Sequence, residues 1–290
     1  MTYLLLSILA SVLIFVVFKL FAKYNVNTSQ AIIANYFIAC ICGIIAYDHP
    51  IVVSEIPNYD WFYYSLGLGV LFIVVFNLMA VTTQRSGLSV VSVATKMSVV
   101  IPILFGLLYY KEHFGTLKIV GILFALVAVY LTSVKTKDGL TIERKNLLYP
   151  LFVFLGSGII DTSIKFLENS YVSENDIPVF SATIFAFAAI IGSLTLVYKS
   201  FVGKLQLSFK NILAGIFLGI PNYFSIFFLV KALRSDLFDS SGIFTVNNVA
   251  IVMVSTLIGI TFFKEKLTLK NWIGIVLAIL SILLITLSNS

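Results

Sequence analysis

The chain has 290 residues, of which 60% are hydrophobic and 11% charged, and its formal net charge is +6. Soluble domains are about 45–50% apolar and about 25% charged, so these values exclude an ordinary soluble domain and indicate an integral membrane protein. The positive charge does not predict nucleic-acid binding, because Lys and Arg stand in short loops between apolar runs, where they set membrane orientation.

Ten apolar runs follow one another along the chain, each close to the roughly 20 residues that a helix needs to cross a membrane. They are Tyr3–Ala22, Ala31–Tyr47, Trp61–Thr83, Leu88–Tyr110, Leu117–Val134, Leu147–Leu167, Ile177–Tyr198, Leu213–Leu233, Ser241–Phe263 and Trp272–Leu287. The segments between them are mostly short and polar. The sequence therefore predicts ten membrane-spanning helices.

The second half of the chain repeats the first. A segment that begins at Lys111 aligns without a gap with one that begins at Lys264, KEHFGTLKIVGILFALVAV with KEKLTLKNWIGIVLAILSI, at a shift of 153 residues. Because each half has five spans, an odd number, the second half enters the membrane from the opposite side. We therefore expect an all-α integral membrane protein with ten transmembrane helices in a 5+5 inverted-topology repeat. The predicted repeat units are residues 1–137 and residues 146–290.

Inverted repeats are typical of secondary transporters, whose substrate sites lie near the membrane midplane between the repeats. The alternative is a duplication in a membrane protein that does not transport. Three pairs of small residues spaced four apart are interpreted as helix-packing positions rather than substrate ligands, because small residues let helices approach closely. They are Gly121 with Ala125, Gly274 with Ala278, and Gly215 with Gly219.

In each half the fourth span ends in Lys-Glu, a short polar turn follows, and the fifth span has an early glycine. These features stand at Glu112 with Gly121 and at Glu265 with Gly274, and basic residues near the ends of the first spans stand at Lys19 and Lys165. With them the chain resembles the drug/metabolite transporter superfamily, in its EamA-like branch. Pro102 matches a proline that is common in the family, whereas the second half has Ser255 in the aligned position.

The resemblance covers nearly the whole chain and implies two five-helix EamA-like repeats that work by alternating access around a central cavity. That cavity would be formed by spans one to four and six to nine. Relatives of this kind export amino acids or other small metabolites, or carry nucleotide sugars and sugar phosphates. The resemblance therefore predicts a small-molecule substrate without identifying it.

Lys96 is the one charged residue in the middle of an apolar span. It follows Ser86 by ten residues, which is about 15 Å of helix and about half of a 30 Å hydrocarbon core. A lysine at that depth costs roughly 2.5–3.5 kcal/mol on insertion scales, so we expect it to face a wet cavity or a partner. Lys96 is predicted to attract an anionic group of the substrate.

Other polar residues of the spans are expected to supply hydrogen bonds. The repeat aligns Lys96 with Asn248 or its neighbour, and of Asn247 and Asn248 at most one needs to face the cavity while the other bonds an adjacent helix. Pro221 removes a backbone hydrogen bond in the eighth span, which is either a binding-site discontinuity or a structural kink. The predicted substrate set is Lys96, Asn77, Asn222, Tyr223, Asn247 and Asn248.

Asp161 is the only acidic residue well inside a predicted span, so it is the candidate carrier of a proton or charge. Three interpretations stay open. It forms an i, i+4 pair with Lys165 on one helix face, it faces the cavity and titrates, or it pairs with Lys96 across the cavity.

Loop charge predicts the orientation in the membrane. Thirteen Lys and Arg residues fall on one side, the side of the loop 134–147, and five fall on the other, namely Lys111, Lys118, Lys165, Lys231 and Arg234. Because positive residues favour the cytoplasm, we expect both termini outside. The family resemblance favours termini inside, so the two indications disagree.

No enzyme motif accompanies these features, and neither His49 nor His113 has metal-ligand spacing around it. Cys40 and Cys42 are two apart on a helix, so a disulfide between them is not expected.

We predict a secondary transporter in the cytoplasmic membrane that exports an amino acid or a similar small solute with an anionic group. It needs no cofactor and no metal, its partners are the solute and the lipid bilayer, and a homodimer is left open. The alternatives are uptake or exchange of sugars or phosphorylated metabolites, and a membrane enzyme or scaffold without transport.

Overall fold

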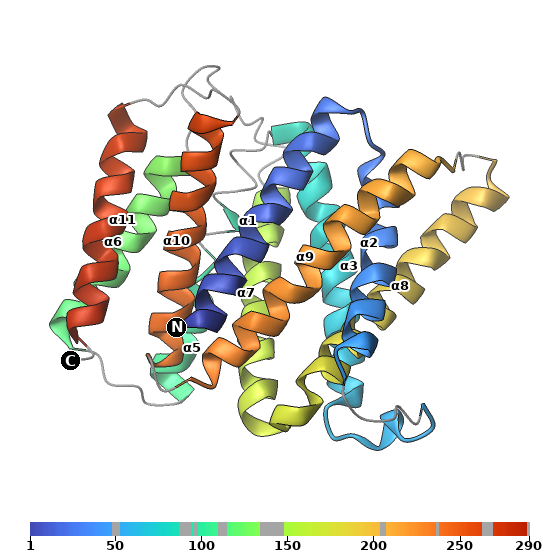
Figure 1. Ribbon diagram of the computed structural model, residues 1–290, viewed down its shortest axis with the longest axis horizontal. Helices are drawn as coiled ribbons and strands as arrows, with labels where there is room; N and C mark the ends of the chain where they lie inside the picture. Colours follow the sequence, from blue (N-terminus) through green and yellow to red (C-terminus); the bar gives the residue numbers. More distant parts are fainter. Residues whose placement is uncertain are drawn as a thin grey trace. The chain divides into compact units, whose positions relative to one another are not determined.

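The computed structural model describes residues 1–47, 53–86, 94–95, 98–109, 115–133, 148–203, 207–235, 238–262 and 269–288. Within these ranges the chain is helical and contains no strand (Figure 1). The ten α-helices of these ranges are α1 (Thr2–Lys23), α2 (Thr28–Ile45), α3 (Phe62–Ser86), α5 (Val100–Tyr109), α6 (Thr116–Ser133), α7 (Leu148–Ser170), α8 (Ile177–Phe201), α9 (Phe209–Leu233), α10 (Ser240–Thr261) and α11 (Leu269–Ser288). Two 3₁₀ turns are η1 (Ile56–Asn58) and η3 (Glu174–Asp176).

Each of the ten predicted apolar runs contains one helix, although α5 covers only the last part of the fourth run, and within the described ranges the predicted all-helical fold is confirmed. Four segments in the described ranges are both long enough and apolar enough to cross a membrane: Thr28–Ile45, Phe62–Met79, Glu174–Tyr198 and Phe209–Leu233. Shorter apolar stretches lie in α1, α6, α10 and α11. Ten crossings and the inverted repeat stay predictions.

The structure adds two details to the predicted spans. α7 continues three residues beyond Leu167, to Ser170, and so includes Glu168. In the eighth span, Pro221 lies inside α9, which is one helix. A proline is tolerated in this position because neighbouring helices support the freed backbone group in a membrane protein.

The helices gather into two compact units. The first contains Leu78–Thr162 and Leu233–Ser290 together with Met1, and the second contains Thr2–Asn77 and Ser163–Ala232. The boundary passes through α3 and α7. Each unit therefore combines helices from both sequence halves, because the closest helix pairs join one half to the other.

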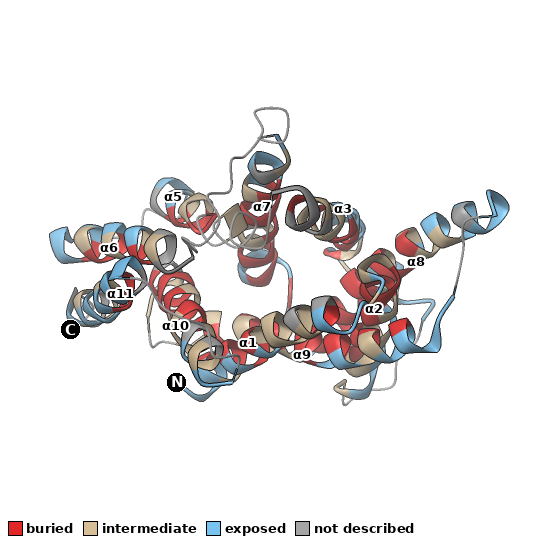
Figure 2. Cartoon of the chain, turned by 90° about the horizontal axis from the view of Figure 1, so that it is seen from above, coloured by how far each residue is buried: buried red, intermediate tan, exposed pale blue. Residues whose placement is uncertain are grey.

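The first unit is built on the pair α6 and α11, which lie side by side in both views (Figures 1 and 2). Ala125 of α6 and Ala278 of α11 form a buried core with Ala128 and with Val249 of α10. The Ser281 hydroxyl donates to the Gly121 carbonyl oxygen across the pair, at 2.7 Å. The small residues of these two spans are packing residues, as predicted.

The second unit contains two other close helix pairs. A Cβ added to Gly43 of α2 would lie 2.5 Å from the Ala182 Cβ of α8, so these two backbones are in contact at the glycine. A Cβ on Gly215 of α9 would lie 2.4 Å from the Ala34 Cβ of α2. The predicted packing role of Gly215 is confirmed, and α2 is held between α8 and α9.

The outward faces of several helices are apolar. In α1, Leu5, Leu9 and Leu13 are each more than half exposed, and they recur every four residues on one face. α8 and α11 carry similar exposed apolar stripes, visible as pale blue positions in Figure 2. Such stripes suit contact with lipid, and they agree with a multi-pass membrane protein.

Candidate functional site

The predicted substrate set is divided between the two units. Asn77, Asn222 and Tyr223 belong to the second unit, whereas Asn247 and Asn248 belong to the first, as does the predicted charge carrier Asp161. Lys96 lies outside the described residues. The surroundings of each described residue are therefore reported within its own unit.

Asn222 lies on the face of α9 that contacts α2. Its side-chain amide donates to the Asn35 side-chain oxygen at 3.0 Å, and Asn222 is only 3% exposed. The Asn35 amide in turn donates to the Ile32 carbonyl oxygen. Asn222 therefore forms a hydrogen bond to a neighbouring helix, which is the common role of an asparagine in a membrane helix pair.

The same face of α9 carries a regular row of small and amide residues. Asn211, Gly215, Gly219 and Asn222 follow one another at spacings of four, four and three, which keeps them on one side of a helix. The Asn211 amide donates to the Gln30 side-chain oxygen at 2.8 Å, and the Asn211 oxygen accepts from the backbone N–H of Asn27 at 2.9 Å. We call this row and its α2 partners the α2–α9 seam. Sequence analysis identified its glycines but not Gln30 or Asn35.

Tyr223 follows Asn222 by one residue and lies in an aromatic cluster. Its ring stacks on Phe227 at 5.7 Å between centroids and meets Phe185 of α8 edge-on at 6.4 Å. Phe185 also stacks on Tyr36 of α2, whose hydroxyl donates to the Phe72 carbonyl oxygen at 3.1 Å. Tyr36 and Tyr223 are both fully buried, but the Tyr223 hydroxyl has no hydrogen-bond partner among the described residues.

Asn77 is partly buried in α3, and its side-chain amide donates to the Ile73 carbonyl oxygen one turn earlier, at 2.7 Å. This bond lies within a single helix. It can be exchanged for a bond to a solute without separating two helices.

Asn247 of α10 is 5% exposed, and its side-chain oxygen has no hydrogen-bond partner among the described residues. Its neighbour Asn248 is half-buried. The two asparagines thus have different surroundings, as expected for successive residues about 100° apart on a helix.

α7 carries one lysine and two acidic residues. Asp161 is half-buried, whereas Lys165 and Glu168 are 3% and 7% exposed. Lys165 and Glu168 are three residues apart and so lie on the same helix face. Glu168 stands two residues before the end of α7, so Asp161 is still the acidic residue well inside this helix. Sequence analysis did not single out Glu168, whose burial is known only from the structure.

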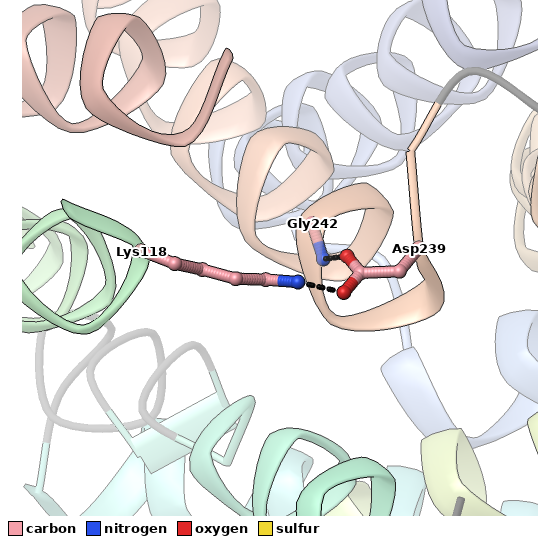
Figure 3. A network of polar contacts seen from close by, with 3 residues as sticks. All are labelled: Lys118, Asp239 and Gly242. Atoms are coloured by element: carbon pink, nitrogen blue, oxygen red, sulfur yellow. Dashed lines mark hydrogen bonds and ion pairs between the residues drawn. The ribbon is translucent and has the colours of Figure 1, made fainter. Parts of the chain in front are cut away.

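An ion pair between a buried lysine and a partly exposed aspartate joins α6 to the start of α10 in the first unit (Figure 3). The ammonium of Lys118, which is 3% exposed, contacts the Asp239 carboxylate. The other oxygen of that carboxylate accepts from the Gly242 backbone N–H at 2.9 Å and caps α10. Sequence analysis counted Lys118 as a loop charge, although the Asp-Ser-Ser-Gly run from Asp239 is a recognisable helix start.

No three His, Cys, Asp or Glu side chains in the described ranges are grouped so that they could hold a metal ion, and Cys40 and Cys42 are free thiols. Gly156-Ser157-Gly158 serves packing: a Cβ on Gly158 would lie 2.3 Å from the Ile101 Cδ1 of α5.

Comparison with known proteins gives three findings. The model of the EamA-like transporter family matches residues 1–134 and again residues 148–287. A protein of Haemophilus influenzae, described only as uncharacterized, is 27% identical over 286 residues, which are 95% of this chain and 94% of that one. A protein of known crystal structure shares the fold with a TM-score of 0.77 at 14% identity, over 99% of this chain and 96% of the other.

Proposed function

Because the chain belongs to the EamA-like transporter family, whose members are multi-pass membrane transporters of small solutes, we propose that it is a secondary transporter. It exports a small polar or amphipathic metabolite with an anionic group, such as an amino acid, across the cytoplasmic membrane. The mechanism is alternating access, in which the five-helix repeats rock about a central solute site.

Two unpartnered polar atoms carry this proposal. The Tyr223 hydroxyl and the Asn247 side-chain oxygen lack hydrogen-bond partners in the described part of the chain, and both residues belong to the predicted substrate set. A buried polar group without a partner costs about 1–3 kcal/mol. Such groups are rare in native proteins and call for an explanation. A solute that bonds to them during transport explains why they are retained.

The burial of these residues favours a transport mechanism in which helices move. Tyr223 is 0% exposed and Asn247 is 5% exposed, so a solute reaches neither of them unless helices shift. Alternating access provides that shift, since each state opens the site to one side of the membrane.

The other members of the set have complementary roles in the proposal. The ammonium of Lys96 attracts the anionic group of the solute. Asn77 and Asn248 contribute hydrogen bonds, Asn77 by giving up its bond within α3. Asn222, which is bonded to Asn35, holds α9 against α2 beside the site. Asp161, half-buried in α7, binds and releases the coupling proton.

The first alternative is uptake or exchange of sugars or phosphorylated metabolites, again attracted by Lys96. The second is a membrane enzyme or scaffold without transport. Flux assays with candidate solutes of each class, on protein reconstituted into liposomes, separate these functions.

The test compares two tyrosines of the same aromatic cluster. In Tyr223→Phe only an unpartnered hydroxyl is lost, so we expect unchanged or slightly raised thermal stability but at least about fivefold lower solute flux. In Tyr36→Phe the bond to the Phe72 carbonyl is lost, so we expect a stability loss of about 1 kcal/mol with flux per folded protein retained.

Thermal unfolding of purified protein and solute flux in proteoliposomes measure the two effects. Full flux in Tyr223→Phe would remove Tyr223 from the site. Full flux of the true substrate in Lys96→Met would remove the proposed charge attraction. A wild-type protein that moves none of the amino acids, sugars or phosphorylated metabolites would overturn transport of these classes altogether.

A further inference from the structure

The Lys118–Asp239 ion pair lies at the start of the helix that carries Asn247. Asp239 precedes Asn247 by eight residues, or about 12 Å of helix. The first turns of α10 are enclosed: Ile243, Phe244 and Thr245 are each at most 1% exposed. The side chains packed around these turns therefore hold in place the helix that carries the unpartnered Asn247 oxygen.

Two contacts hold α10 against α6 from opposite ends of this segment. At one end the Lys118 ammonium contacts the Asp239 carboxylate (Figure 3). Two residues beyond Asn247, Val249 packs with Ala125 and Ala128 of α6 and with Ala278 of α11. The apolar contact limits how closely the helices approach, and the ion pair ties the start of α10 to α6, so that rotating or sliding α10 would separate the two charges.

The Asp239 carboxylate uses its two oxygens for two purposes. One accepts the Gly242 N–H and thereby terminates the helix, and the other contacts the ammonium of a lysine that is almost fully buried. Removing the carboxylate charge would leave the Lys118 ammonium, which is 3% exposed, in a poorly solvated place without its counter-charge, and that is destabilising. The cost of displacing α10 therefore includes the cost of separating this pair.

The predicted repeat does not duplicate the pair. At the shift of 153 residues Lys118 aligns with Asn271, and at the shift of 152 Asp239 aligns with Gly87. Neither position in the other half can form an ion pair of this kind. The pair thus joins Lys118 of the first half to the start of the helix that carries Asn247 and Asn248, and the aligned positions have no equivalent pair, which is an asymmetry that helix packing alone does not require.

We propose that Lys118 and Asp239 are positioning residues: their ion pair fixes the rotation and depth of α10 and so directs the Asn247 side-chain oxygen toward the transported solute. This inference rests on the proposed transport function, and neither residue touches the solute itself. Breaking the pair should weaken solute binding while leaving the transport machinery in place.

The test separates the charge from the helix cap. Asp239→Asn keeps an oxygen that can cap α10, because Asn is as good a capping residue as Asp, but it removes the carboxylate charge. Lys118→Met removes the ammonium while keeping an apolar stem of similar length. Lys118→Arg keeps the positive charge and serves as the rescue variant. The matched control is Asp176→Asn, an aspartate just before α8 whose side chain does not cap that helix.

The first measurement is hydrogen exchange of the wild-type and variant proteins in lipid nanodiscs. In Asp239→Asn and Lys118→Met, the backbone amides of residues 243–249 should exchange at least about tenfold faster. Those of α11 should be unchanged. Lys118→Arg and Asp176→Asn should match the wild type. Unchanged exchange in the first two variants would overturn the idea that the ion pair holds α10.

The second measurement is the concentration dependence of solute flux in proteoliposomes. Loss of positioning should raise the half-saturating concentration about five- to tenfold. The maximal rate should stay within about twofold, and Lys118→Arg should restore both values. A lower maximal rate at an unchanged half-saturating concentration would mean that less protein is folded, and it would overturn the positioning role.

The two measurements also separate this inference from the function on which it rests. If the wild type moves no tested solute, the proposed function fails and the positioning role fails with it. The exchange data still decide whether the ion pair holds α10. If flux is normal in the wild type and Asp239→Asn changes neither measurement, the transport proposal stands and this inference alone is overturned.

Discussion

At the scale of single residues, side chains of the same type differ in burial and in hydrogen bonding in ways that the amino-acid sequence does not indicate. Tyr36 and Tyr223 are both fully buried, yet only Tyr36 has a partner for its hydroxyl. Asp161 and Glu168 stand on the same helix, but Asp161 is half-buried and Glu168 is 7% exposed. A group that exchanges protons with an aqueous cavity must be reachable by water, so the half-buried carboxylate is the better carrier.

This difference gives a prediction for the two carboxylates. Asp161→Asn should abolish flux driven by a pH gradient while leaving the thermal stability close to that of the wild type. Glu168→Gln should lower thermal stability by about 1–3 kcal/mol, because Glu168 shares a buried helix face with Lys165, and should keep the response to the gradient.

Flux with and without an imposed pH gradient, combined with thermal unfolding, measures both effects. Lys165→Ala serves as the control for the alternative in which Asp161 only pairs with Lys165. Loss of the gradient response in Glu168→Gln but not in Asp161→Asn would make Glu168 the carrier.

At the scale of helices, close packing depends on where a glycine meets another backbone. A Cβ on Gly215 would lie 2.4 Å from the Ala34 Cβ and 2.7 Å from the Ala31 carbonyl oxygen, whereas a Cβ on Gly67 of α3 would meet nothing within 4 Å. Both glycines are inside helices. The α2–α9 seam therefore requires glycine at position 215, and α3 does not require it at position 67.

Gly215→Ala and Gly67→Ala form a matched pair of variants. Gly215→Ala should destabilise the protein by roughly 1–3 kcal/mol, because the added methyl group forces α9 away from α2 and strains the seam. Gly67→Ala should be neutral or stabilise by up to about 1 kcal/mol, because alanine favours the helix and space is available.

Thermal unfolding in one detergent compares the two variants directly. Equal stability of Gly215→Ala and the wild type would show that α2 and α9 can move apart at this contact with little cost in free energy. The same result would weaken the view that Asn222 is held firmly by Asn35.

At the scale of the whole molecule, the charged residues bear on orientation. Of the five basic residues on the charge-poor side, Lys118 and Lys165 are each 3% exposed, so they do not meet lipid headgroups or water. Lys231 lies over the rings of Tyr3 and Phe227, at 5.5 and 5.0 Å from their centroids. Fewer than five exposed basic residues thus stand on the charge-poor side, and the count of thirteen against five still predicts termini outside.

Labelling of single cysteines tests this orientation at the two ends of one helix. In a background with Cys40 and Cys42 replaced by alanine, Ser173→Cys stands just before α8 and Ser200→Cys near its end, and both positions are exposed. An impermeant thiol reagent added to intact cells should label Ser173→Cys and not Ser200→Cys. The opposite pattern would place the termini inside and would contradict the charge argument.

The helices were predictable from the amino-acid sequence because a long apolar run in a membrane has few alternatives to a helix. Each of the ten runs contains a helix in the described ranges, and Ala125, Ala278, Gly215 and Gly219 pack as predicted. The ends of the helices were less certain. Glu168 was not singled out because hydropathy does not indicate whether neighbouring helices bury a polar residue.

The partners of polar side chains were decided only by tertiary structure. Composition and spacing identified Asn222 as a polar residue in a span, but the closeness of α2 makes Asn35 its partner. Likewise, the amino-acid sequence indicates that Lys118 is a loop charge, whereas in the structure it contacts Asp239 at the start of α10. Helix formation depends on neighbours in sequence, whereas a buried hydrogen bond or ion pair depends on which helices meet. The sequence by itself therefore determined the family and the helices, and the tertiary structure decided which polar groups are already paired and which are left for a solute.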